Sequence, residues 1–151
     1  MKNLILLVFG VVITLVLVLF SSHIYEALYY ERAFSDAMYN GNVYFMIALF
    51  SSIILWVMAV IYYYIINSVR FSRWYHWLVM LLGASCLATT MNYYYAKSIF
   101  TADKLDFSLQ LFNFSVIETI LNMVLFIVVS FSIRLSLIHI WRCRRIERCR
   151  S

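Results

Sequence analysis

Four long stretches of the chain carry at most one charged side chain each. They lie at about residues 3–22, 43–67, 74–95 and 107–133, and the chain contains no proline. A helix needs about 20 mostly apolar residues to cross the hydrocarbon core of a bilayer. Strands of a membrane barrel would alternate polar and apolar residues over about 10 positions, and these stretches do not alternate. The pattern predicts an all-α integral membrane protein, a bundle of four transmembrane helices.

The overall composition favours the same class. Hydrophobic residues make up 65% of the 151 residues and charged residues only 13%, whereas a soluble domain is about 25% charged. So few charges cannot cover a water-soluble surface. Intrinsic disorder is also excluded, because it requires low hydrophobicity and a high net charge.

The end of the chain differs abruptly from the rest. Residues 135–151 hold five of the 12 basic residues and two of the three cysteines. Within them, LSLIHIWRCRR resembles a translated sequencing adapter, and segments of that kind are set aside before a fold is considered. We therefore expect a native domain over residues 1–134 and a non-native tail over 135–151, with the true sequence beyond Arg134 unknown.

The tail also explains two misleading signals. The net charge of +5 comes mostly from it, so the charge does not predict binding to nucleic acid. Cys143, Cys149 and His139 lie close together in the sequence, but their spacing is poor for zinc, which favours cysteine pairs two to four residues apart. No metal site is expected.

The positions of Lys and Arg predict the orientation, because short cytoplasmic loops carry an excess of both. Lys2 precedes the first span, and Arg70 and Arg73 lie in the second connection with no acid between them. The first connection has one arginine against three acids, the third has two lysines against two acids, and Arg134 follows the fourth span. We expect both termini to be cytoplasmic, in the inner membrane of a bacterium.

The first connection, residues 21–42, is expected to be helical. Its apolar residues recur at helical spacing: Ile24, Ala27, Leu28, Phe34 and Met38. This pattern predicts an amphipathic helix at the outer interface or a protruding extension of the first span. Asn40-Gly41 is expected to end it, because glycine readily takes the left-handed conformation of a helix C-terminus.

Glu118 is the one charged residue inside a predicted span. A charge near the bilayer centre costs at least about 2.5 kcal/mol, so Glu118 must be protonated, paired or exposed to a wet cavity. Helical spacing puts polar side chains of the third and fourth spans on one face each. They predict an intramembrane polar cluster of Ser85, Thr89, Ser115, Glu118, Thr119 and Asn122, in which a protonated Glu118 donates to Thr89 or Ser85.

Three roles of Glu118 remain open from the sequence. The carboxyl can stabilise packing within the chain, pair with a basic residue of another subunit, or couple the movement of a proton or ion. The third span also has small residues, Gly83, Ala84 and Ala88, where helices can approach closely. They predict a helix-packing face, within the chain or between two copies.

Motifs of known enzymes are missing from the sequence, including paired carboxylates, HExxH and a glycine-rich phosphate loop. We therefore expect no catalysis and no cofactor. The expected function is a non-catalytic accessory or anchoring subunit of a larger bacterial envelope complex, such as a secretion or transport assembly. Its partners would be the lipid bilayer and another membrane protein or a second copy. The alternative is a small transporter or channel that uses Glu118 as its coupling carboxyl.

Overall fold

The computed structural model describes residues 2–63, 74–102 and 106–148, with side chains described for residue 5 and from residue 7 to Arg134 within these ranges. Within these ranges every regular element is a helix, which confirms the all-α prediction. The helices are α1 (Lys2–Leu19), α2 (Ser21–Leu28), α3 (Arg32–Asn40), α4 (Val43–Ile61), α5 (Trp74–Ala102) and α6 (Ser108–Arg148). Arg70 and Arg73, on which the predicted orientation depends, lie outside the described residues.

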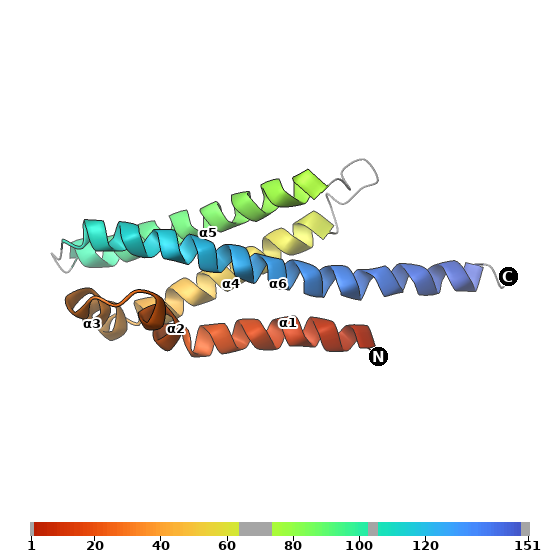
Figure 1. Ribbon diagram of the computed structural model, residues 1–151, viewed down its shortest axis with the longest axis horizontal. Helices are drawn as coiled ribbons and strands as arrows, with labels where there is room; N and C mark the ends of the chain where they lie inside the picture. The colour runs from red at the N-terminus through yellow and green to blue at the C-terminus, as the bar shows by residue number, and fades with distance from the viewer. Residues whose placement is uncertain (1, 64–73, 103–105, 149–151) are drawn as a thin grey trace.

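The four long helices run along one common direction, and α6 lies among the other three (Figure 1). Helix α6 packs against α1, α4 and α5, and α4 also contacts α1 and α5. The short helices α2 and α3 lie together at one end, where both pack against α4. The last turns of α6 extend past the ends of the other helices (Figure 1).

Two helices are long and apolar enough to cross a membrane, namely α4 and the Ser108–Arg134 part of α6. A third span results if Leu7–Leu19 and Ser21–Leu28, which are bent by 73° at the break, are counted together. Helix α5 does not meet this criterion, because aromatic and polar residues occupy both of its ends. Two or three helices of this kind indicate a membrane protein, but they are fewer than the four spans expected.

The first connection forms two helices instead of one amphipathic helix or a straight extension. Phe34 and Met38 of the expected apolar face are buried, whereas Leu28 is exposed and Tyr25 is buried in its place. The 73° bend after α1 directs α2 away from the axis of α1, so α2 does not continue the first span. Helix α3 ends at Asn40 as predicted, but Gly41 has a φ of −81° and Asn42 takes the left-handed conformation with a φ of 53°.

The core divides into two clusters along the length of the molecule. The first is aromatic and lies where α2 and α3 cover the ends of α4, α5 and α6; Tyr25, Phe34, Tyr44 and Phe114 are its largest members. The second is mostly aliphatic and lies farther along α4, α5 and α6. Large apolar side chains also cover the outside of the long helices, as expected where lipid or another apolar surface replaces water.

One glycine is required for close packing between α1 and α6. A Cβ added at Gly10 would lie 2.5 Å from Ser132 Oγ and 2.8 Å from Ser132 Cβ. A Cβ added at Gly83 on α5 would meet no atom within 4 Å, so Gly83 is not at a close helix contact. Of the predicted packing residues, Ala84 and Ala88 are fully buried, but Gly83 faces outward.

We predict that Gly10→Ala lowers the free energy of unfolding by about 1–3 kcal/mol relative to Gly83→Ala, because overpacking forces the helices apart. Both changes gain the same helix propensity, about 1 kcal/mol, so Gly83→Ala is a matched control. Unfolding in mixed detergent micelles measures the difference. Ser132→Gly removes both close atoms, and a double-mutant cycle should show that it relieves the Gly10→Ala defect. Equal stability of the two alanine variants would contradict the close contact.

Candidate functional site

The centre of the molecule holds a polar cluster around Glu118, which is only 1% exposed. Its Oε1 atom accepts hydrogen bonds from three side chains. Asn92 Nδ2 on α5 donates at 2.5 Å, Ser51 Oγ on α4 at 3.3 Å, and Asn122 Nδ2 on α6 at 3.4 Å. The carboxyl therefore joins three helices of the same chain at one atom.

Asn92 is the second member of the cluster and is fully buried. Besides Glu118, its Nδ2 contacts Ser51 Oγ at 2.7 Å and the carbonyl oxygen of Ile47 at 3.3 Å. An amide nitrogen has two hydrogens, so these three acceptors compete for two donors. Asn92 Oδ1 is buried and has no hydrogen-bond partner within the described part of the chain.

Two threonines extend the cluster along α5 and α6. Thr89 Oγ1 accepts from Asn122 Nδ2 at 3.3 Å and from Thr119 Oγ1 at 3.1 Å. Thr119 Oγ1 also lies 2.8 Å from the carbonyl oxygen of Ser115. Together with Asn122, the threonines connect Glu118 to the next turn of α5.

The predicted polar residues thus divide into two groups. Thr89, Glu118, Thr119 and Asn122 lie together in one hydrogen-bonded cluster. Ser85 and Ser115 are also buried, but each donates to its own helix, Ser85 to the carbonyl of Leu81 and Ser115 to that of Leu111. Among the described contacts, Glu118 makes no bond to Thr89 or Ser85, which was the expected pairing; its partners are Ser51, Asn92 and Asn122.

Ser51 contributes to the site but was not predicted from the sequence. It belongs to the second apolar stretch, where a buried serine usually donates to its own backbone, as neighbouring Ser52 does to Ala48. The sequence feature that could have predicted a polar partner on another helix is Asn92, which lies on the same helical face as Ser85 and Thr89. A buried asparagine on one helix indicates a polar partner on another, but not which residue supplies it.

The charges near Glu118 are few. Helix α4 has no charged residue, and on α5 Lys97 lies exposed over the ring of Tyr93. Among the described residues, no group of three or more His, Cys, Asp or Glu side chains is positioned to hold a metal ion. The cluster has one acid surrounded by amide and hydroxyl groups, so it is suited to hydrogen bonding and to holding a proton.

A second set of polar contacts lies farther along α6. Trp77 Nε1 of α5 donates to Ser130 Oγ at 2.7 Å, and the Tyr63 hydroxyl after α4 lies 2.8 Å from the same oxygen. Ser130 therefore joins the same three helices as Glu118. Between these two sites lies the second core cluster, to which α4, α5 and α6 all contribute.

Comparisons with known proteins give no further identification. No protein-family model matches the chain, and searches of curated proteins and of solved structures find no significant similarity.

We predict that Glu118→Ala lowers the free energy of unfolding by about 2–3 kcal/mol, because it leaves buried donors of Ser51, Asn92 and Asn122 without their acceptor. Glu118→Gln keeps an acceptor oxygen and should cost less. Thermal unfolding in detergent, followed by circular dichroism, measures both changes.

Adjacent threonines on α5 give a control for this prediction. Thr89 lies in the cluster, whereas Thr90 is exposed and donates to the carbonyl of Cys86. Thr89→Val should therefore destabilise the protein more than Thr90→Val. If Glu118→Ala and Thr89→Val both unfold like the unmodified chain, the cluster does not stabilise the fold.

Proposed function

We propose that the chain is a four-span membrane protein with both termini in the cytoplasm, and that it is a non-catalytic accessory or anchoring subunit of a larger envelope complex in the bacterial inner membrane. In this arrangement α1, α4, α5 and α6 form a four-helix bundle across the bilayer. Helices α2 and α3 then lie at the outer surface. Secretion and transport assemblies are the kinds of complex that use such subunits.

The packing of α1 and α5 supports four spans. Both helices run beside α4 and α6 for much of their length (Figure 1), so a bilayer that contains α4 and α6 also surrounds them. Trp74 and Tyr75 at one end of α5 and Tyr94 towards the other are exposed, and such aromatic residues favour the two interfaces of a membrane. The polar ends of α5 then extend beyond the hydrocarbon core.

The main observation in support of an accessory role is that the polar side chains face the inside of the bundle. Glu118, Asn92 and Asn122 face inward and bond to one another, whereas the outside is covered by large apolar side chains, as Phe9, Leu15 and Ile120 illustrate. Because Glu118 has donors within its own chain, it does not need a basic residue of another subunit. The surface left for lipid or a partner helix is apolar.

The alternative function, a small transporter or channel, has one specific observation in its favour. A buried acid beside an unpaired carbonyl oxygen, Asn92 Oδ1, is the kind of intramembrane group that moves protons or ions in transport proteins. The single acid and its internal hydrogen bonds favour the accessory role over this alternative.

The proposed orientation predicts the result of reporter fusions. A reporter enzyme that works only in the cytoplasm should be active when it is joined after Arg70, because that connection has two arginines and no acid. A reporter joined after Asn42 should behave as periplasmic. The opposite pair of results would reverse the topology, and two cytoplasmic results would remove α4 as a span.

The two functions predict different effects of Glu118→Gln. For an accessory subunit, proteoliposomes that contain only this chain show no proton or ion flux above empty vesicles. The complex extracted from native membranes keeps its composition in the Glu118→Gln variant, because the exposed apolar surface is unchanged. A flux that Glu118→Gln abolishes and Thr90→Val preserves would instead establish the transporter.

A further inference from the structure

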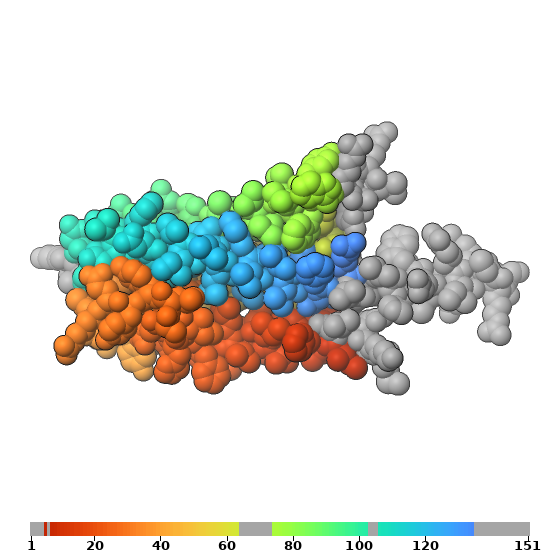
Figure 2. All heavy atoms as spheres, in the orientation of Figure 1, coloured from red at the N-terminus to blue at the C-terminus, as the bar shows by residue number. Residues whose placement is uncertain are grey.

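A pocket of about 260 Å³ lies at the α2–α3 end of the molecule, between the start of α2 and the start of α4. In Figure 2 this end is formed by α2 and α3, next to the first turns of α6. Most of the residues that line the pocket are polar and uncharged, namely Ser21, Ser22, Tyr39, Asn42 and Tyr44. Its ligand must therefore be recognised by hydrogen-bonding groups.

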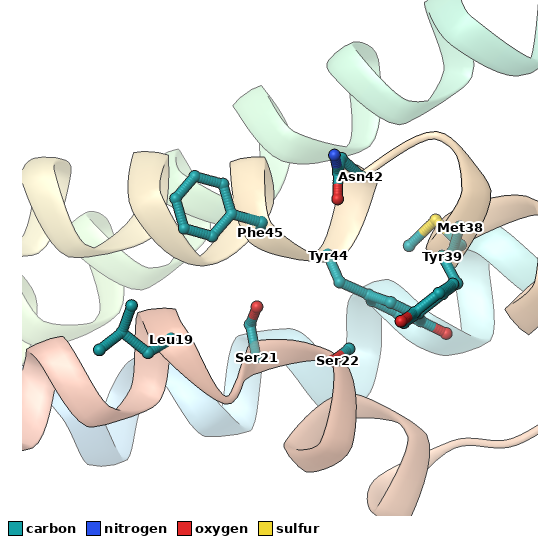
Figure 3. Close-up of a pocket in the computed structure, with 8 residues that line it drawn as sticks. All are labelled: Leu19, Ser21, Ser22, Met38, Tyr39, Asn42, Tyr44 and Phe45. Atoms are coloured by element: carbon teal, nitrogen blue, oxygen red, sulfur yellow. The ribbon is translucent and has the colours of Figure 1, made fainter.

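Ser21 is a buried residue that points into this pocket. It is only 3% exposed, and its hydroxyl makes no hydrogen bond to any residue that the structure describes. Figure 3 shows this hydroxyl at the start of α2, directed towards the start of α4. The buried serines Ser52 and Ser85, in contrast, donate to the carbonyl oxygen four residues earlier. A buried hydroxyl without a partner is uncommon and costs free energy, so Ser21 indicates a ligand that accepts a hydrogen bond in the pocket.

The N-termini of two helices line the pocket. Ser21 and Ser22 begin α2, whereas Asn42 is the N-cap of α4 and Tyr44 lies in its first turn. The first backbone N–H groups of a helix have no partner within that helix. Neither α2 nor α4 has a side-chain hydrogen bond that caps its N-terminus. Backbone donors of both helices are therefore available at this end of the molecule.

The side chains around these N-termini add further donors. The Ser22 and Tyr39 hydroxyls and the Asn42 amide can each donate a hydrogen bond. Tyr44 is 1% exposed, and its hydroxyl also has no hydrogen-bond partner among the described residues. A ligand that satisfies this set must offer several acceptor atoms close together.

The charge balance at the pocket favours an anion with a single charge. None of the described lining residues is charged, and Glu26, the first acid along α2, follows Ser22 by about one helical turn. Each helix N-terminus carries about half a positive elementary charge, so two of them balance about one negative charge. A phosphodiester has one negative charge and two non-ester oxygens that accept hydrogen bonds, and phosphate groups commonly bind at helix N-termini.

Apolar residues beside the polar ones indicate where such a ligand comes from. Leu19 and Phe45 also line the pocket, and they are 71% and 39% exposed. Leu15 and Val12, one and two turns before Leu19 on α1, continue this exposed apolar surface. Helix α4 is long and apolar enough to cross a membrane, so its start lies near the level of the lipid headgroups. The volume is below the roughly 300–1,000 Å³ of sites that enclose a whole small molecule, which suits a headgroup whose acyl chains stay outside.

From these observations we infer that the pocket binds the phosphodiester group of a membrane phospholipid, one molecule to each chain. The N-termini of α2 and α4 and the hydroxyls of Ser21 and Ser22 bind the non-ester oxygens, and an acyl chain lies against Leu19 and Phe45. The bound lipid then joins α2 to α4. Free phosphate offers the same oxygens but lacks the acyl chains. This lipid site goes beyond the accessory role and requires only that α4 crosses the membrane.

Native mass spectrometry of the full chain in detergent tests the inference, because it counts the lipids bound to each chain. After removal of native lipid, one phosphatidylglycerol should bind at least about tenfold more tightly than diacylglycerol with the same acyl chains, which lacks the phosphate acceptor. Inorganic phosphate should displace it only weakly. Equal binding of the two lipids would overturn the inference, and so would tighter binding of inorganic phosphate than of phosphatidylglycerol, which would make free phosphate the ligand.

Serine variants test the site itself. Ser21→Ala should weaken the binding of phosphatidylglycerol about tenfold, because it removes one donor to a charged acceptor. Ser22→Asp should weaken it further, because its carboxylate repels the phosphate, although an acid in the first turn favours the helix. Ser98→Ala should change nothing and is the matched control, because Ser98 is exposed on α5 and donates to the carbonyl of Tyr95.

Unchanged binding in both pocket variants would overturn the inference. If a variant fails to fold, the comparison of the two lipids on the unmodified chain still decides. Failure of the accessory role would appear separately, as a change in the composition of the extracted complex.

Discussion

The structure depends on how a carboxyl group is accommodated inside a body of apolar helices that offers it no basic partner. In such an interior an unpaired polar group costs several kcal/mol. Glu118 is accommodated by amide and hydroxyl donors from α4, α5 and α6 at one oxygen atom. Because Ser51 and Asn92 come from α4 and α5, the acid fixes the rotation and the axial position of these two helices relative to α6. Apolar contacts are less directional and do not fix these positions as strictly.

Helix α6 has a corresponding central place in the fold. Its buried face carries the acid at one level and Ser130 at another, and each joins α4 and α5 to it. On a further face α6 approaches α1 closely enough that Gly10 has no room for a side chain. The space between helices is thus set by hydrogen bonds on one side of α6 and by a missing side chain on the other.

Sequence features with strong physical consequences were sufficient to predict much of this arrangement. The uncharged stretches predicted helices, and the polar spacing on the third and fourth stretches predicted a cluster in which Thr89, Glu118, Thr119 and Asn122 do meet. Ser51 was not predictable in this way, because two adjacent serines in an apolar stretch give no periodic signal. The close helix contact at Gly10 was not predictable either. The small residues around Gly83 predicted a contact there, but which glycine lies at a contact depends on how each helix is rotated about its axis.

The bend after α1 was also hidden in the sequence, and it determines the asymmetry of the molecule. The stretch from residue 3 to residue 22 contains no proline, so nothing in it predicts a break at Phe20. Because α2 turns by 73° there, Tyr25 enters the core beside Tyr44 instead of continuing along the axis of α1. The aromatic core cluster therefore contains two tyrosines, Tyr25 and Tyr44, whereas the buried members of the second cluster are aliphatic except for Phe126. A straight first helix would carry Tyr25 away from this cluster, so the bend is what allows its ring to pack against Tyr44 and Phe114.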